Sequence, residues 1–149
     1  MKGTLRRTVV AITAAASVLA TGGCAVSAPD AAGWDEQART SLADAAGEVA
    51  TARLTLETAA DERTWPSYAV VVLAEAEDAA ATLHDDLAKV QVPAERREVA
   101  AEVLGLLAAA ATSVREARQA AVGGRYGDPA LMQELDRLLQ ALESGAESG

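Results

Sequence analysis

The side chains with the widest chemical range are also the scarcest, since the chain has one cysteine, Cys24, and one histidine, His84. A single thiol cannot form an internal disulfide, and one thiol with one imidazole is too few ligands for a zinc site. A di-iron helical bundle pairs its histidine with a glutamate three residues earlier, but Ala81 stands there. We therefore expect no metal site, and we interpret His84 as a surface residue beside Asp85 and Asp86.

Carboxylates occur in adjacent pairs, such as Asp61–Glu62 and Glu77–Asp78. General acid–base catalysis needs two carboxylates that converge in a pocket. Neighbours in a helix instead point about 100° apart, because a turn takes 3.6 residues. The pairs are typical of solvated surface charge. The sequence also lacks a Gly-x-Ser-x-Gly elbow, a phosphate loop, a dinucleotide fingerprint and an EF-hand loop. It therefore predicts a protein that is not an enzyme and needs no cofactor.

The segment before Cys24 has the layout of a secretory signal peptide. Lys2, Arg6 and Arg7 give a basic start, and an uncharged and mostly apolar run follows from Thr8 to Ala20. Small residues then lead into the cysteine, as a signal peptidase requires. The basic start favours the cytoplasmic side, so the rest of the chain is expected to cross the membrane.

Residues 19–24, Leu-Ala-Thr-Gly-Gly-Cys, resemble the lipobox of bacterial lipoproteins, particularly those of actinobacteria. The family's pattern has an aliphatic residue three before the cysteine, where this chain has Thr21. The resemblance implies cleavage after residue 23 and a diacylglycerol on Cys24, which anchors the protein to membrane lipid. It covers only this N-terminal region and implies nothing about the fold of the mature part, which resembles no characterised family.

An uncleaved anchor remains the alternative, because no charge occurs between Thr8 and Pro29 and a tilted helix of that length spans about 30 Å. Both interpretations place the domain at the outer face of the cytoplasmic membrane. We expect residues 1–23 to be the signal peptide and residues 24–33 to be a tether.

The acidic composition of the exported part argues against some classes of binding partner. The net charge is −9, and loss of residues 1–23 removes three positive charges and no negative ones. Nucleic acid binding needs clustered Lys and Arg, and an anionic lipid surface repels an acidic domain. We therefore expect no nucleic acid partner, and a protein of the envelope or membrane instead. Abundant alanine and only 3% aromatic residues favour helices over strands.

Four segments show the alternating three- and four-residue apolar spacing of packed helices. They span residues 34–62, 66–90, 93–122 and 129–144. Short connections make consecutive helices antiparallel neighbours. The sequence thus predicts an all-α, up-down antiparallel four-helix bundle over residues 34–144, with three long alanine-rich helices, a shorter fourth and a disordered tail at 145–149. The expected core positions are Ala38, Leu42, Ala45, Val49, Ala52, Leu56, Ala59, Ala69, Leu73, Ala76, Ala80, Leu83, Leu87, Val90, Ala100, Val103, Leu107, Ala110, Val114, Ala117, Ala121, Leu131, Leu135, Leu138 and Leu142.

The start of the second helix is the first candidate surface for a partner. One helix face cannot bury three consecutive valines, so we expect Val71 to project outward. The antiparallel arrangement brings the connection after the third helix to this end, which is the end away from Cys24. The candidate patch comprises Trp65, Tyr68, Val71, Val72 and Tyr126. Aromatic residues are enriched in interface cores, although the same residues would also serve to close the end of the core.

The second candidate surface is a strip of small residues on the outer side of the third helix, formed by Ala101, Gly105, Ala108 and Ala109. Such strips let another helix approach closely, and an ordinary alanine-rich solvent face is the alternative. Taken together, the sequence predicts a lipid-anchored, non-catalytic interaction or structural module. The alternative function is a bundle that binds a small ligand or senses envelope stress.

Overall fold

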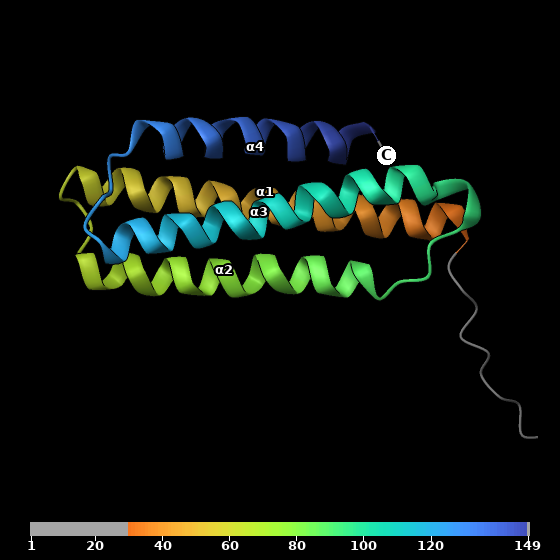
Figure 1. Cartoon of the computed structure of the whole chain (residues 1–149), viewed down its shortest axis with the longest axis horizontal. Helices are drawn as coiled ribbons and strands as arrows, with labels where there is room; N and C mark the ends of the chain where they lie inside the picture. Colours follow the sequence, from red (N-terminus) through yellow and green to blue (C-terminus); the bar gives the residue numbers. More distant parts are fainter. Residues whose placement is uncertain (1–29, 149) are drawn as a thin grey trace, which may run out of the picture.

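Four helices make up nearly all of the part of the chain that the structure, a computed structural model, describes, namely residues 30–148. They are α1 (Ala31–Ala60), α2 (Pro66–Ala88), α3 (Arg97–Val122) and α4 (Pro129–Ser148), with a 3-10 turn, η1 (Ala94–Arg96), before α3. No strand occurs in this region. The predicted all-α class and the number of helices are confirmed (Figure 1).

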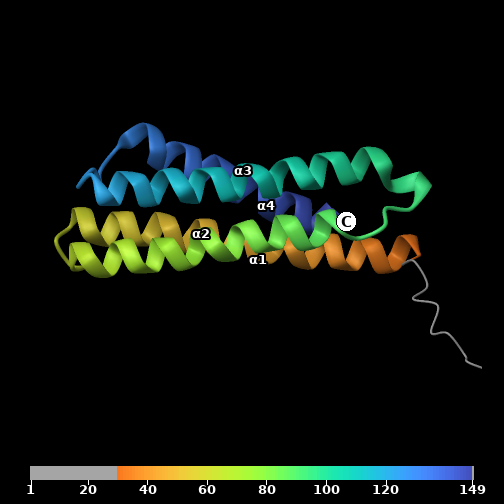
Figure 2. The same cartoon turned by 60° about the horizontal axis from the view of Figure 1, so that its bottom comes forward.

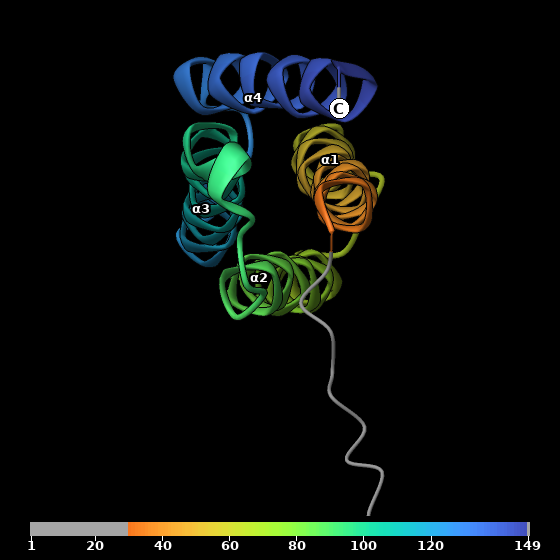
Figure 3. The same cartoon turned by 90° about the vertical axis from the view of Figure 1, so that its right-hand side faces the viewer.

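The helices run alternately up and down along one long axis (Figures 1 and 2). The view along that axis shows α1 and α3 side by side, with α2 covering one side of the pair and α4 the other (Figure 3). Both α1 and α3 contact each of the other helices. The connection between α1 and α2 and the connection between α3 and α4 therefore meet at one end, and the chain enters α1 at the other.

Local signals in the sequence set the ends of the helices. The Asp30 carboxylate accepts a hydrogen bond of 2.8 Å from the Gly33 amide and caps α1. Asp128 caps α4 in the same way, with Oδ1 3.0 Å from the Ala130 amide nitrogen. Gly123 follows α3, and Gly124 has a φ of +69°, a conformation that glycine adopts without strain.

The core consists of alanine, leucine and valine apart from one tryptophan, Trp34. The predicted core positions in α1 and α3 are all buried. In α2 and α4 most are buried, while Leu83, Val90 and Leu131 are half-buried and pack against the core. The core cluster is continuous within residues 34–142.

Several predicted helix ends differ from the structure by two to four residues: α1 ends at Ala60, α2 ends at Ala88 and α3 begins at Arg97. Two further differences change the predicted limits of the domain. The helix α1 begins at Ala31, so residues 31–33 belong to the bundle and not to the tether. The helix α4 continues to Ser148, so the predicted tail at 145–149 is wrong for residues 145–148. Packing explains the longer helix: a Cβ on Gly145 would lie 3.1 Å from the Leu42 Cδ1 atom, and Ala146 packs against the core. Tertiary contact thus outweighs the low helix propensity of glycine.

Candidate functional site

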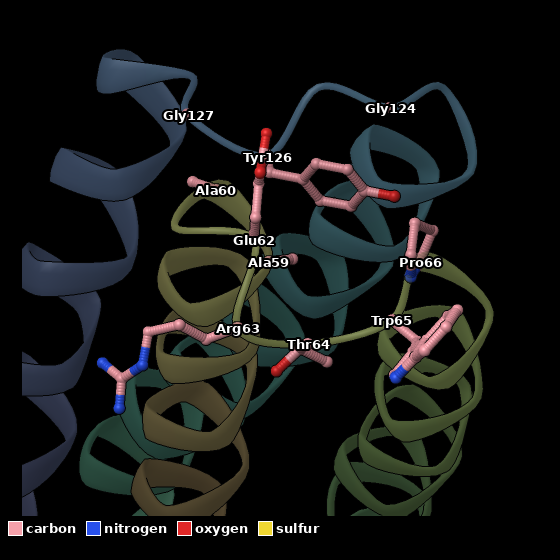
Figure 4. A pocket seen from close by; sticks show the side chains of 10 residues that line it. All are labelled: Ala59, Ala60, Glu62, Arg63, Thr64, Trp65, Pro66, Gly124, Tyr126 and Gly127. Atoms are coloured by element: carbon pink, nitrogen blue, oxygen red, sulfur yellow. The ribbon is translucent and has the colours of Figure 1, made fainter.

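The end of the bundle at which the two connections meet is hollowed. Ten residues from the end of α1, the start of α2 and both connections line an open hollow of about 700 Å³. Glu62, with a φ of +57°, turns the chain out of α1, and Pro66 starts α2. Figure 4 shows the Tyr126 ring directed toward Pro66, while the Arg63 side chain extends to the opposite side. The predicted proximity of Tyr126 to the start of α2 is confirmed.

Large apolar and aromatic side chains are exposed around this hollow. Trp65 is 79% exposed, Tyr68 63% and Val71 53%, so the expected outward projection of Val71 is confirmed. Val122, at the end of α3, is 63% exposed and lines a second hollow together with Pro66. We call Trp65, Tyr68, Val71 and Val122 the distal patch, because they gather at the end opposite the start of α1.

The other two residues of the predicted patch have a different environment. Val72 is half-buried. Tyr126 is half-buried and packs against the core. Neither side chain therefore offers a partner as much surface as the exposed residues do. The sequence analysis did not identify Val122. Its exposure could have been inferred, because Val122 is a large apolar residue that lies outside the predicted core spacing and precedes two glycines.

The small-residue strip lies on the surface as predicted. Ala101, Gly105, Ala108 and Ala109 are all exposed on α3. An added Cβ on Gly105 would meet nothing within 4 Å. The packing of a single chain therefore gives no reason for glycine at this position.

The ionisable groups form cross-helix pairs. Glu77 on α2 binds two arginines of α3, accepting hydrogen bonds from Arg118 and from Arg115, whose Nε atom is 3.0 Å from the Glu77 Oε1 atom. Asp35 on α1 binds the guanidinium of Arg96 through two hydrogen bonds of 2.7 Å. The paired residues are far apart in the sequence, so the spacing of residues in the sequence did not reveal these ion pairs.

The histidine and the remaining acids do not converge. The His84 Nδ1 atom lies 3.1 Å from the Asp85 Oδ1 atom, and the side chain is partly exposed. Within residues 30–148, no three side chains of His, Cys, Asp or Glu come together as metal ligands do. Cys24, the predicted lipid site, lies outside the described residues.

Glu77 gives a test of this electrostatic arrangement. The hydrogen bond from Arg118 is the main cause that lowers the pKa of Glu77 below its ordinary 4.5; burial opposes the shift and Arg115 adds to it. A lowered folded-state pKa stabilises the fold fully above pH 4.5, and this contribution is lost as the pH falls through the folded-state value. We expect Glu77→Gln to cost up to about 1 kcal/mol at pH 7, since the pair is partly exposed.

Urea unfolding at pH 7 and pH 3 measures this effect. The difference between Glu77→Gln and the original protein should shrink at pH 3. Asp78→Asn, at the exposed neighbour with no ion pair among residues 30–148, is the matched control and should leave the midpoint unchanged. An equal effect of both substitutions at pH 7 would contradict the pairing.

Comparison with known proteins adds no relative to this all-α bundle, since no protein-family model, no curated protein and no solved structure matches the chain. Among residues 30–148, none of the helices has the length and apolar content needed to cross a membrane.

Proposed function

We propose that this protein is a lipid-anchored, non-catalytic interaction module at the outer face of the cytoplasmic membrane, and that the distal patch binds another envelope protein. The supporting observation is the clustering of exposed apolar surface. Of the six large exposed hydrophobic side chains within residues 30–148, four belong to the distal patch. Scattered exposed apolar residues are normal, whereas a gathered set at one end is typical of an interaction site.

The residue types in the distal patch suit an interface. Tryptophan and tyrosine are enriched among the residues that contribute most to binding, and their truncation commonly costs about 2 kcal/mol or more. The surface at the distal patch is not flat. Trp65 and Val122 each border a hollow that a side chain of a partner can fill. Tyr68 and Val71 lie inside α2, so their backbone does not have to be ordered on binding, which lowers the entropy cost.

The geometry of the bundle supports an anchored module. The helix α1 has 30 residues and rises 1.5 Å per residue, so it is about 45 Å long. Asp30 caps the end of α1 nearest to Cys24, and the distal patch lies at the opposite end. A lipid on Cys24 would therefore hold the patch about 45 Å beyond the anchored end of the bundle. That reach suits a partner which extends from the membrane or the cell wall.

Two substitutions in the distal patch test this proposal. Tyr68→Asp combined with Val71→Asp is expected to release a co-purifying envelope protein, because charge would be buried without a partner in the interface. Both residues are exposed, so the helical circular dichroism signal should not change. Val99→Asp, which alters a 45% exposed valine at the other end of the bundle, is the control and should retain the partner. Equal retention by both variants would refute the assignment of the patch.

A further inference from the structure

A narrow groove opens at the end of the bundle opposite the distal patch. The helix α4 ends before it covers the full length of α1 and α3 (Figure 1). The groove is lined by these two helices and by the last turn of α4. Its volume is about 280 Å³. The apolar part of its wall consists of Trp34, Ala38, Leu42, Val99, Val103 and Leu106. Gly145 and Ser148 of α4 close one side.

The Nε1–H group of Trp34, in this wall, has no hydrogen-bond acceptor among residues 30–148. The residue is 1% exposed, and its Nε1 atom is the only buried side-chain nitrogen or oxygen within residues 30–148 that lacks a hydrogen-bond partner. An indole N–H buried without an acceptor destabilises a protein, and such groups in native proteins call for an explanation. An acceptor atom brought by a ligand would provide one.

The charges beside the groove indicate which kind of acceptor fits. Asp35, Arg39 and Glu102 line it, which gives two acids and one base. Both nearby arginines are already paired, Arg96 with Asp35 and Arg39 with Glu36. Glu102 has no ion pair among residues 30–148, so a fatty carboxylate in the groove would face net negative charge. An uncharged carbonyl oxygen accepts a hydrogen bond without that penalty.

We propose that this groove binds one acyl chain of a neutral lipid, with the ester carbonyl accepting a hydrogen bond from Trp34 Nε1. At about 30 Å³ per small group, the volume holds about nine non-hydrogen atoms, which suits a medium chain or the first part of a long one. Because Nε1 is buried, the proposed binding requires a local opening next to the groove, such as fraying of the last turn of α4. This site is separate from the distal patch and does not depend on the function proposed for it.

The test uses the full chain with Trp65→Tyr, so that Trp34 is the only tryptophan. The probe is 1-monodecanoylglycerol below its micelle concentration, and the readout is the indole N–H proton resonance of Trp34. We expect this resonance to move downfield on binding, as it does when an indole N–H gains an acceptor. In a second arm, phosphatidylcholine vesicles replace the monoglyceride. A shift in either arm supports the proposal and shows whether free or bilayer lipid is the source, and no shift in both arms overturns it.

A second ligand isolates the hydrogen bond. 1-O-decylglycerol has the same chain with an ether in place of the ester, and we expect it to bind about five-fold more weakly, which is the usual effect of one hydrogen bond. Trp34→Phe should remove this preference, so that the ester and the ether bind with equal affinity. The helical circular dichroism signal shows whether the variant still folds. Retention of the preference in Trp34→Phe would overturn the role given to Nε1.

Surface variants locate the site. Val99→Asp places a charge in the groove wall and should weaken binding of the monoglyceride at least ten-fold. Val122→Asp changes an exposed valine of the same helix at the other end and should leave the affinity unchanged. Equal effects of the two substitutions would place the binding elsewhere.

Discussion

Replacement of Cys24 by alanine is expected to abolish incorporation of a labelled fatty acid into the protein. The proposed attachment forms a thioether to diacylglycerol at the only thiol in the chain, so no other cysteine can substitute for it. Each methylene of a buried acyl chain contributes about 0.8 kcal/mol, and two chains give stable membrane anchoring. The effect should thus be the complete loss of label, together with loss of the cleavage that follows lipidation.

Growth with an alkyne-tagged fatty acid, followed by purification and mass spectrometry, measures both events. The original protein should carry the label and begin at residue 24. Ser27→Ala changes a nearby small residue and should retain both properties. Label that persists in Cys24→Ala would contradict the assignment. An unlabelled original protein that retains residues 1–23 and stays in the membrane would support the uncleaved anchor instead.

Truncation of Leu107 is expected to cost about 3 kcal/mol of the free energy of unfolding. Leu107 is fully buried near the middle of α3, which contacts all three other helices. The loss combines the transfer of the removed methyl groups with a cavity that rigid neighbours cannot fill. Domains are stable by only about 5–15 kcal/mol in total, and a core this rich in alanine buries little apolar area per residue. Leu107→Ala should therefore leave only a marginally stable bundle.

Urea unfolding followed by circular dichroism measures this loss. Leu54→Ala is the matched control, since this leucine is 58% exposed on α1 and its truncation should change the stability by less than about 0.5 kcal/mol. Similar unfolding midpoints for the two variants would mean that α3 does not pack as the structure shows.

The helical architecture was predictable because it depends on local patterns. Apolar residues at three- and four-residue intervals define one buried stripe per helix, and the positions predicted for α1 and α3 are all buried. The ends of the helices depend on residues close by in the sequence, such as Asp128, Pro66 and the glycines after α3. Such residues can be recognised from the local sequence alone. The predicted start of the first helix, at residue 34, was three residues late, because the Asp30 carboxylate accepts a hydrogen bond from the Gly33 amide and caps a helix that begins at Ala31.

The features that were missed depend on contacts between distant segments. Nothing in the sequence shows that Glu77 faces Arg115 and Arg118, because that pairing requires the register between α2 and α3. The lone Nε1 donor of Trp34 and the groove beside it also arise only when α1, α3 and the end of α4 come together. For the same reason Val122 joined the distal patch only in the folded structure.

Photo-crosslinking in intact cells tests the central claim, that the distal patch contacts an envelope protein, most directly. A photoreactive amino acid replaces Tyr68 in one strain and Glu98, an exposed residue at the other end of the bundle, in a second strain. We predict one discrete crosslinked protein from position 68, its absence from position 98, and a lower yield in Cys24→Ala. The same products from both positions, or none from position 68, would contradict the account.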